Sequence, residues 1–414
     1  MSKFLTENKI KVKKLVFVCG FNNYFGINEE YDTVNESMYF NNLEDVKKYA
    51  EEIICFYSDN DPYVNYEAEK EFADTIATEQ ILLKDAGHIN SSEQFVIKSD
   101  VAADIAPARG KTPLVEENEA AVMITAGKVI VKVDKASGYL AGYQHAGRQV
   151  LKTPFVPNFW RAETDNDWRG WKPSYYLKVW KDAAENLSRP EIETTIEGDV
   201  AVVAVKRTLG ARKAELTLKY SVYPDGRLNV AYDVKIADDV LEPLRIGLQG
   251  QIAGELDNLA YFGRGPQENY CDRNDGVFLG LWKTSPEDMM YQYVYPQENG
   301  NRTDVRWISC VDDKGKGIAF VGSQPLSVSA WNTTQDQLQK AMHIGEPVIL
   351  ADSFVLNVDL LQTGVGGTDS WSQRARPYDH HRLLAKSYSY DFWMIPVKNM
   401  SESVDAGRKF CRKY

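Results

Sequence analysis

Two side chains in the first ninety residues are of the types that carry acid–base chemistry, and each follows a predicted strand. Asp61 lies in the segment SDNDPYV (residues 58–64), and His88 lies in AGHIN (residues 86–90). In a parallel sheet the carboxyl ends of neighbouring strands meet at one edge. The Asp61 carboxylate could therefore hold the His88 imidazole in the tautomer of a general base. The alternative for Asp61 is an N-cap of a helix that begins at Pro62.

These two motifs resemble the C-terminal half of the small serine hydrolases of the α/β-hydrolase superfamily, over about residues 10–90. The resemblance implies that Asp61 takes the position of the acid and His88 that of the base. Such enzymes also need a serine on a sharp strand-to-helix turn with the pattern G-x-S-x-G. Residues 1–90 contain no such pattern. We therefore interpret residues 1–92 as a partial α/β-hydrolase-like segment, an inactive remnant.

A second group of chemically promising residues lies in four aromatic and polar motifs further along the chain. The first motif, PNFWRAETDND (residues 157–167), places three side-chain carboxylates beside a tryptophan and an arginine. Its Asp165, Asn166 and Asp167 could accept hydrogen bonds from sugar hydroxyls or coordinate a hard cation. They could equally pair with nearby arginines and cap a turn, and both interpretations are open on the sequence alone.

The last of the four motifs, GVGGTDSW (residues 364–371), is suited to presenting an aromatic ring at a rim. Its three glycines allow the chain to turn sharply. An exposed Trp371 indole could pack on the C–H face of a pyranose, while Asp369 and Ser370 hold the loop or a sugar hydroxyl. The alternative for Trp371 is a core or interface aromatic. The two motifs in between are expected to form buried charge networks that connect loops: FGRGPQENY (residues 262–270) and YPQENG (residues 295–300).

In this order and spacing the four motifs resemble the C-terminal domain of glycoside hydrolase family 2 β-galactosidases, which in some members is a separate small chain. The resemblance covers about residues 93–397, and Thr368, Cys271 and Trp168 are minor departures from the family pattern. It implies a galactose-mutarotase-like β-supersandwich, a galactoside or related sugar as ligand, and Trp371 at the sugar site.

The resemblance also implies hydrolysis of terminal β-D-galactosides with retention, by two carboxylates about 5–5.5 Å apart. In the family both glutamates come from a TIM barrel that precedes this domain. Residues 1–90 are too short for a barrel of about 250 residues. The sequence therefore predicts a module that is inactive without a large catalytic β-galactosidase subunit. The alternatives are a free-standing carbohydrate-binding module and a non-functional fusion with the serine-hydrolase remnant.

The elements that must position these residues differ between the two parts of the chain. In residues 1–92 short apolar runs alternate with helical stretches, 42–52 and 62–77, which predicts a small parallel sheet with covering helices. In residues 120–397 the apolar period is two, and turn signals separate many short strands, which predicts an antiparallel sandwich. The fold class is thus mainly β. We expect residues 93–119 to be a linker and residues 398–414 to be a disordered tail.

Charge and cysteine content exclude several functions. The net charge of −11 would repel nucleic acid and anionic membranes. Five widely spaced cysteines without a CxxC pair argue against a disulfide framework or a thiolate zinc site. No cofactor is identifiable, and a divalent cation is expected only through a partner catalytic domain. The polar N-terminus lacks a signal-peptide pattern, so we expect a cytoplasmic protein.

Overall fold

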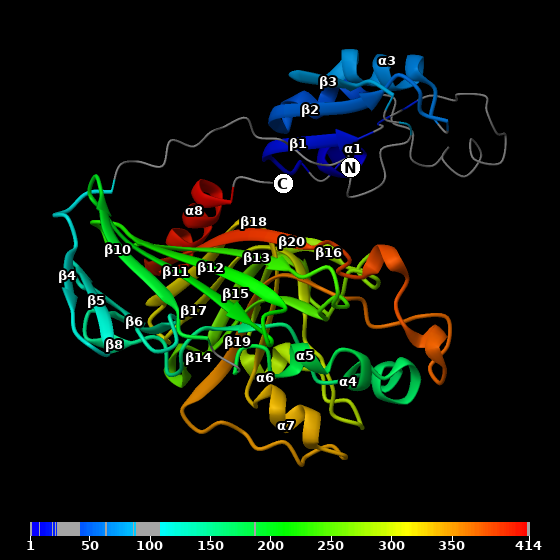
Figure 1. Cartoon of the computed structure of the whole chain (residues 1–414). Coiled ribbons are helices and arrows are strands. Elements are labelled where there is room, and N and C mark those ends of the chain that lie inside the picture. The colour runs from blue at the N-terminus through cyan, green and yellow to red at the C-terminus, as the bar shows by residue number, and fades with distance from the viewer. Residues whose placement is uncertain are drawn as a thin grey trace. The chain divides into compact units, whose positions relative to one another are not determined.

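The computed structural model describes residues 2–7, 9–18, 20, 22, 42–62, 64–85, 87, 108–185 and 188–411 (Figure 1). The chain divides into two compact units, Met1–Ser99 and Asp100–Tyr414, and each is described by itself. His88 and the first part of the predicted linker, residues 93–107, lie outside the described residues.

The first unit contains a three-stranded parallel sheet in the order β1, β2, β3. Each strand contains one of the short apolar runs of the sequence, preceded by polar residues, as in LVFV of β1 and IICFY of β2. Ile53 and Tyr57 of β2 share a buried core with Phe72 and Ile76 of α3. The elements are α1 (Ser2–Glu7), β1 (Val12–Val18), η2 (Leu43–Lys48), β2 (Ala50–Ser58), α3 (Tyr66–Ile76) and β3 (Glu79–Leu83).

Both predicted helices of this unit are shorter in the structure. The stretch 42–52 forms only the 3-10 helix η2, because the chain enters β2 at Ala50. The second helix begins at Tyr66 rather than at Pro62. Its N-cap is Asn65, whose side-chain oxygen accepts a hydrogen bond from the Ala68 N–H at 2.8 Å.

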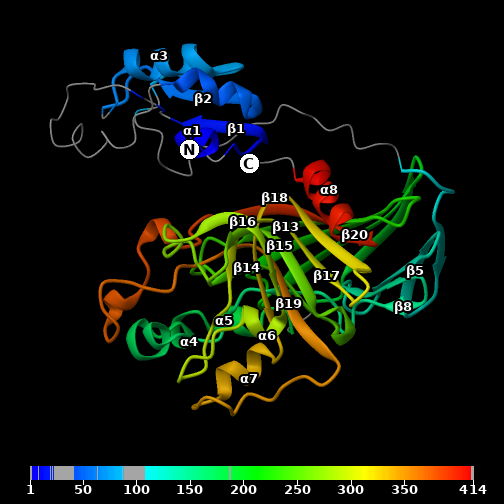
Figure 2. The ribbon, with the colours of Figure 1, turned by 180° about the vertical axis from the view of Figure 1, so that it is seen from behind.

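The second unit is built from two antiparallel sheets and short helices, and Figure 2 shows the larger sheet curling around its core. The large sheet runs in the order β10-β11-β12-β13-β20-β18-β17-β15-β16, with β14, β19 and β9 attached to it, and the small sheet runs from β4 to β8. The strands of the small sheet are β4 (Leu114–Glu117), β5 (Ala121–Ala126), β6 (Val129–Asp134), β7 (Leu140–His145) and β8 (Arg148–Gln149). Those of the large sheet are β9 (Val156–Asn158), β10 (Glu191–Glu197), β11 (Val200–Leu209), β12 (Ala214–Val222), β13 (Leu228–Ile236), β14 (Arg245–Ala253), β15 (Asn258–Gly265), β16 (Phe278–Thr284), β17 (Arg302–Val311), β18 (Gly317–Trp331), β19 (Ser353–Gln362) and β20 (Ser387–Val397). The helices are η3 (Asn166–Trp171), α4 (Pro173–Tyr176), α5 (Lys178–Lys181), η4 (Gly254–Leu256), α6 (Pro286–Met289), α7 (Gln335–Lys340), η5 (Gln373–Ala375), η6 (Asp379–His381) and α8 (Met400–Phe410).

The period-two patterns predict the hairpins of this unit. Strands β12 and β13 pair antiparallel around the turn at Asp225, with Val222 opposite Leu228. Strands β17 and β18 pair in the same way across the turn that follows Val311. The alternating apolar residues of these strands lie in one large buried core. The mainly β, antiparallel fold predicted for this part of the chain is confirmed.

Strand β19 departs from the simple pattern, because both of its faces are buried. The apolar face contributes Leu356 and Val358 to the core. The opposite face places Asn357 and Asp359 in the interior as well, each with 0% exposure. Buried polar groups need partners inside the protein, so this face of β19 requires a polar network.

The two predicted boundaries of the sandwich need correction. Strand β4 pairs with β5 at its N-terminal edge, so the small sheet starts inside the predicted linker. The expected disordered tail instead contains the helix α8, capped by Asn399. Phe410 packs on Trp393 with ring centroids 4.8 Å apart, and Ala406 is buried in the same cluster. The i, i+4 spacing of Ala406 and Phe410 is the amphipathic signal for the helix.

Candidate functional site

The glycine-rich segment that follows β19 is fixed through its backbone. The carboxylate of Asp272 accepts hydrogen bonds from the N–H groups of Val365 at 2.7 Å and Gly366 at 2.9 Å. A Cβ atom on Gly364 would lie 2.5 Å from the same Asp272 oxygen, so a side chain there would displace the carboxylate. On the other side, the Arg161 guanidinium donates to the carbonyl oxygens of Thr363 at 2.8 Å and Gly364 at 3.0 Å. The loop is therefore rigidly positioned.

This braced loop ends in an exposed indole. Trp371 has 76% of its surface exposed, which does not fit the alternative of a core aromatic. The Asp369 carboxylate accepts hydrogen bonds from the backbone N–H groups of Trp371 at 3.2 Å and Ser372 at 3.0 Å. It also accepts one from the Ser372 hydroxyl at 2.7 Å, which lowers the pKa of Asp369. Asp369 thus holds the loop, the first of its two predicted roles, while Ser370 is exposed beside the indole.

Asp167 does not face a ligand. It is fully buried, and its two oxygens accept hydrogen bonds from Arg161 Nε and Nη2, both at 2.9 Å. The Thr164 N–H at 3.0 Å and the Trp171 indole N–H at 2.9 Å complete its acceptor sites. This geometry matches the alternative in which the acid pairs with an arginine and caps a turn. We correct its assignment from sugar contact to support of the loop, because no oxygen is left for a sugar hydroxyl.

The neighbouring Asp165 and Asn166 are placed differently. The Asp165 carboxylate is half exposed and forms an ion pair with Arg169 at 3.5 Å. The Asn166 side-chain amide donates to the Val365 carbonyl oxygen at 3.2 Å. The structure therefore brings the first and last predicted motifs together, although about 200 residues separate them in the sequence. Both residues remain predicted sugar contacts.

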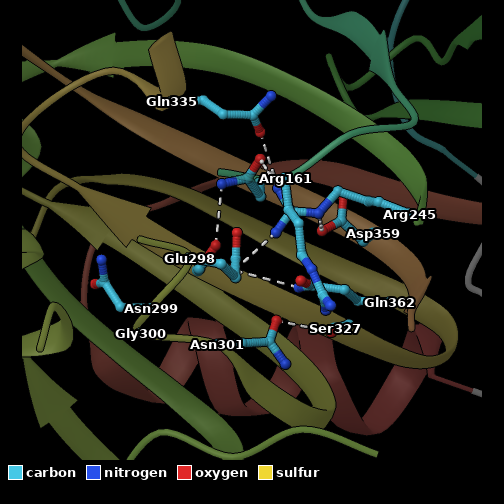
Figure 3. Close-up of polar contacts among 12 residues, drawn as sticks. Arg161, Arg245, Glu298, Asn299, Gly300, Asn301, Ser327, Gln335, Asp359 and Gln362 are labelled. Carbon is cyan, nitrogen blue, oxygen red and sulfur yellow. Dashed lines mark hydrogen bonds and ion pairs between the residues drawn. The ribbon is translucent and has the colours of Figure 1, made fainter. Parts of the chain in front are cut away.

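A buried ionic network lies beneath these loops, and the sequence did not reveal its centre. Arg245, at the start of β14, is fully buried and pairs with Glu298 at 2.9 Å and with Asp359 at 3.2 Å (Figure 3). Its guanidinium also donates to the Asn357 side-chain oxygen at 3.1 Å. Glu298 in turn accepts a hydrogen bond from Gln362 at 3.3 Å, in the strand that leads into the glycine loop. The expected charge network around Glu298 is thus present.

The buried network contains more carboxyl groups than guanidinium groups. Arg161 and Arg245 face three buried carboxyl groups, those of Asp167, Glu298 and Asp359. Burial raises the pKa of Asp359 to about 8, and the nearby Glu298 charge adds to that effect while Arg245 opposes it. Burial also raises the pKa of Glu298, so the charged forms of both acids around Arg245 are disfavoured relative to water.

In the first unit the structure brings the two predicted catalytic segments close together. The Asn60 side chain accepts a hydrogen bond from the Gly87 N–H at 2.6 Å, and Asp59 accepts one from the Asp85 N–H at 2.7 Å. Asp61 accepts one from the Val64 N–H at 3.1 Å, so it caps the turn before α3 rather than the helix itself. His88 lies outside the described residues, and its predicted pairing with Asp61 stays a prediction.

Other classes of site were searched for in the part of the chain that the structure describes. No group of three or more His, Cys, Asp or Glu side chains there could hold a metal ion. The four cysteines described, Cys55, Cys271, Cys310 and Cys411, are free thiols. None of the described helices is long and apolar enough to cross a membrane.

Fold and site together define a class of protein: a large antiparallel β-sandwich that presents an exposed tryptophan on a braced glycine loop. The chain belongs to the β-galactosidase small-chain family, whose model matches residues 125–394. A serine hydrolase family model matches residues 1–102. The two resemblances noted in the sequence are thereby confirmed.

The relatives that the chain matches are longer than the chain itself. A β-galactosidase of Priestia megaterium is 30% identical over 342 residues, which cover 81% of this chain and 33% of the relative. A β-galactosidase of Lactobacillus delbrueckii subsp. bulgaricus is 34% identical over 246 residues, 59% of this chain and 24% of the relative. The chain thus spans about a third or less of the length of these relatives. The solved structure of a galactose 1-epimerase from Lactobacillus acidophilus shows a weak likeness, with a TM-score of 0.43 and 7% identity over 70% of this chain and 99% of that chain.

Proposed function

We propose that the sandwich unit completes the galactoside site of a β-galactosidase by packing against a large chain that carries the catalytic barrel. The observation that carries the proposal is the exposed Trp371 on a loop whose backbone is held from two sides, by Asp272 and by Arg161. The indole is presented to solvent on a loop that is held in place, and an aromatic face can pack on the C–H face of a sugar. Membership of the β-galactosidase small-chain family supports the same conclusion.

In this proposal the two parts of the enzyme divide the chemistry. The large chain supplies the nucleophile and the acid/base carboxylate of a retaining glycosidase. The sandwich supplies a rigid apolar wall at Trp371 that orients the sugar and excludes water from it. Asp165 and Asn166 lie next to the glycine loop, and in this proposal they accept or donate hydrogen bonds to sugar hydroxyls.

Complementation tests the proposal. The Priestia megaterium β-galactosidase, deleted for the region that aligns with this chain, would be mixed with the purified chain and assayed on a nitrophenyl β-galactoside. We expect the mixture to regain turnover and Trp371→Ala to lower its kcat/KM at least about tenfold, the loss of one stacked contact.

A matched control makes this test specific. Phe278 on β16 is 77% exposed, as much as Trp371, but belongs to the edge of the large sheet. Phe278→Ala should leave the restored turnover within about twofold, since surface changes away from the site are close to neutral. Equal losses in the two variants would show that Trp371 has no particular role at the sugar. Absence of any restored turnover with the intact chain would remove the support for a complementing chain.

A second candidate function is a free-standing carbohydrate-binding module, and the same exposed indole favours it. It predicts that a galactoside alone changes the tryptophan fluorescence of the chain, and that Trp371→Ala abolishes the change without loss of folding. The complementing-chain proposal predicts weak binding alone, because the remaining walls of the site belong to the partner.

A further inference from the structure

A cavity far from the glycine loop gathers positive side chains in an otherwise acidic chain. Its volume is about 620 Å³, and its lining comes from the start of β6, the end of β7, the β12–β13 turn, the β17–β18 turn and the start of α8. Figures 1 and 2 show the small sheet at one end of the sandwich unit and the orange segment between β19 and β20 at the other. The cavity is therefore separate from the proposed sugar site.

The charges in this cavity do not cancel. Four of its lining residues are cationic, Lys128, Arg227, Lys316 and Lys398, and two are acidic, Asp225 and Glu402. Both acids are already engaged. Asp225 pairs with Arg227 at 2.7 Å, and Glu402 accepts a hydrogen bond from the backbone N–H of Lys398 at 2.9 Å.

Three lysines are left over. In the part of the chain that the structure describes, the ammonium groups of Lys128, Lys316 and Lys398 make no ion pair, and all three side chains are exposed to the cavity or to solvent. Helix α8 begins two residues after Lys398, so its N-terminal dipole adds positive potential at the same wall. His145, also in the lining, has its pKa lowered by partial burial and by the charges of Lys128, Lys398 and Arg148. The charges of Lys128 and Lys398 therefore act together at His145, and Lys316 lines the same cavity.

The rest of the lining sets the kind of ligand. Pro396, which is partly exposed, and Ile395 form the apolar part of the lining. A free inorganic anion would use the charges but not this apolar part, whereas a ring compound that carries a phosphate would use both. The volume is ample for a molecule of that size.

We propose that this cavity binds a small phosphate monoester with a ring, its phosphate held by Lys128, Lys316 and Lys398 and its ring against Ile395 and Pro396. Such a site is independent of the galactoside site. The chain has no net attraction for anions, so binding depends on the local cluster rather than on overall charge.

The test is a titration of the full chain with phenyl phosphate, and with inorganic phosphate in parallel, followed by the NMR signals of the His145 ring. We expect saturable shifts with phenyl phosphate and weaker binding of inorganic phosphate. The double variant Lys128→Gln/Lys398→Gln should weaken phenyl phosphate binding at least about tenfold, since a charge-assisted hydrogen bond is lost at each position.

The control variant is Lys235→Gln/Lys283→Gln, which removes two exposed lysines on β13 and β16, outside the cavity lining. It should bind phenyl phosphate like the native chain. Circular dichroism checks that both variants fold. Equal weakening in both double variants, or unchanged binding in Lys128→Gln/Lys398→Gln, would overturn the proposal. So would the absence of any His145 shift up to the solubility limit of phenyl phosphate. The galactosidase turnover restored by complementation is a separate readout. It tests the proposed function, whereas the phenyl phosphate titration tests this cavity.

Discussion

Replacing Asp167 by asparagine tests the assignment of this residue to the support of the glycine loop. The change keeps the shape of the side chain but removes the negative charge that faces the fully buried Arg161. It leaves a guanidinium without its bidentate partner in the protein interior. Breaking a buried ion pair in this way costs about 3–5 kcal/mol.

The structure favours the lower end of that range. Glu298 also interacts favourably with Arg161, so the cation is not left wholly uncompensated. We expect Asp167→Asn to lower the free energy of unfolding by about 3 kcal/mol, a large part of the roughly 5–15 kcal/mol that stabilises a typical protein. Asp165→Asn is the matched control. Its ion pair with Arg169 spans 3.5 Å between half-exposed side chains, and such pairs contribute about 0–1 kcal/mol.

Urea unfolding followed by tryptophan fluorescence measures both values. All nine tryptophans lie between Trp160 and Trp393, so the signal reports on the sandwich unit alone. The double variant Arg161→Met/Asp167→Leu should recover much of the stability lost in Asp167→Asn, because it removes both charges at once. If Asp167→Asn and Asp165→Asn cost the same, our account of Asp167 is wrong. The sugar-contact alternative would then regain support.

Three further predictions concern the network, the loop and the C-terminal helix. Because burial raises the pKa of Asp359 to about 8, the folded state keeps a proton that the unfolded chain releases above about pH 4. The free energy of unfolding should therefore fall as pH rises from about 4 to 8, by up to about 1.4 kcal/mol per pH unit. In urea titrations Asp359→Asn should flatten this slope, and the control Asp352→Asn, at an exposed position, should leave it unchanged. Gly364→Ala places a Cβ atom 2.5 Å from the Asp272 carboxylate and should reduce the turnover restored by complementation several-fold without loss of folding. In the control Gly366→Ala the nearest atom to the new Cβ is 3.7 Å away, and turnover should be unchanged. Equal activities in the two variants would show that the position of the loop is unimportant. Phe410→Ala should lower the free energy of unfolding of the sandwich unit by about 3 kcal/mol in the same assay. Arg408→Ala, on the exposed face of α8, should change that free energy by no more than about 0.5 kcal/mol. Equal values for the two variants would mean that α8 does not stabilise the unit.

The strands could be predicted from the sequence because their signal is local. The alternation from Leu216 to Val222 and the turn at Asp225 are contained within about twenty residues, and the hairpin follows from them. The same holds for the exposed Trp371, since glycines on a short motif predict a turn that lifts the indole out.

The polar network could not be predicted in full, because burial of both faces of β19 is a property of the whole fold. Asn357 and Asp359 alternate with apolar residues, as solvent-facing residues do. Only the complete fold makes them interior, where Arg245 of the paired strand β14 contacts both. Arg245 stands between Leu244 and Ile246 with no motif around it. Its partners Glu298 and Asp359 lie more than fifty residues away, so the pairing is visible only in three dimensions.

Helix α8 shows a different limit. The segment 398–414 that contains it is polar and basic, which led to the prediction of a disordered tail. The few apolar positions, Val404, Ala406 and Phe410, were too sparse to stand out. They stabilise the helix only because Trp307 and Trp393 provide an apolar surface on the sheet. Tertiary packing rather than helix propensity decides such segments.

The most direct test of the central claim is hydrolysis of a nitrophenyl β-galactoside by the chain alone and by the chain mixed with the barrel-bearing part of the Priestia megaterium enzyme. Our account predicts no turnover by either component alone and clear turnover by the mixture, with kcat/KM at least about tenfold lower in Trp371→Ala. Turnover by the chain alone would contradict it, because the sandwich would then hold a carboxylate pair of its own.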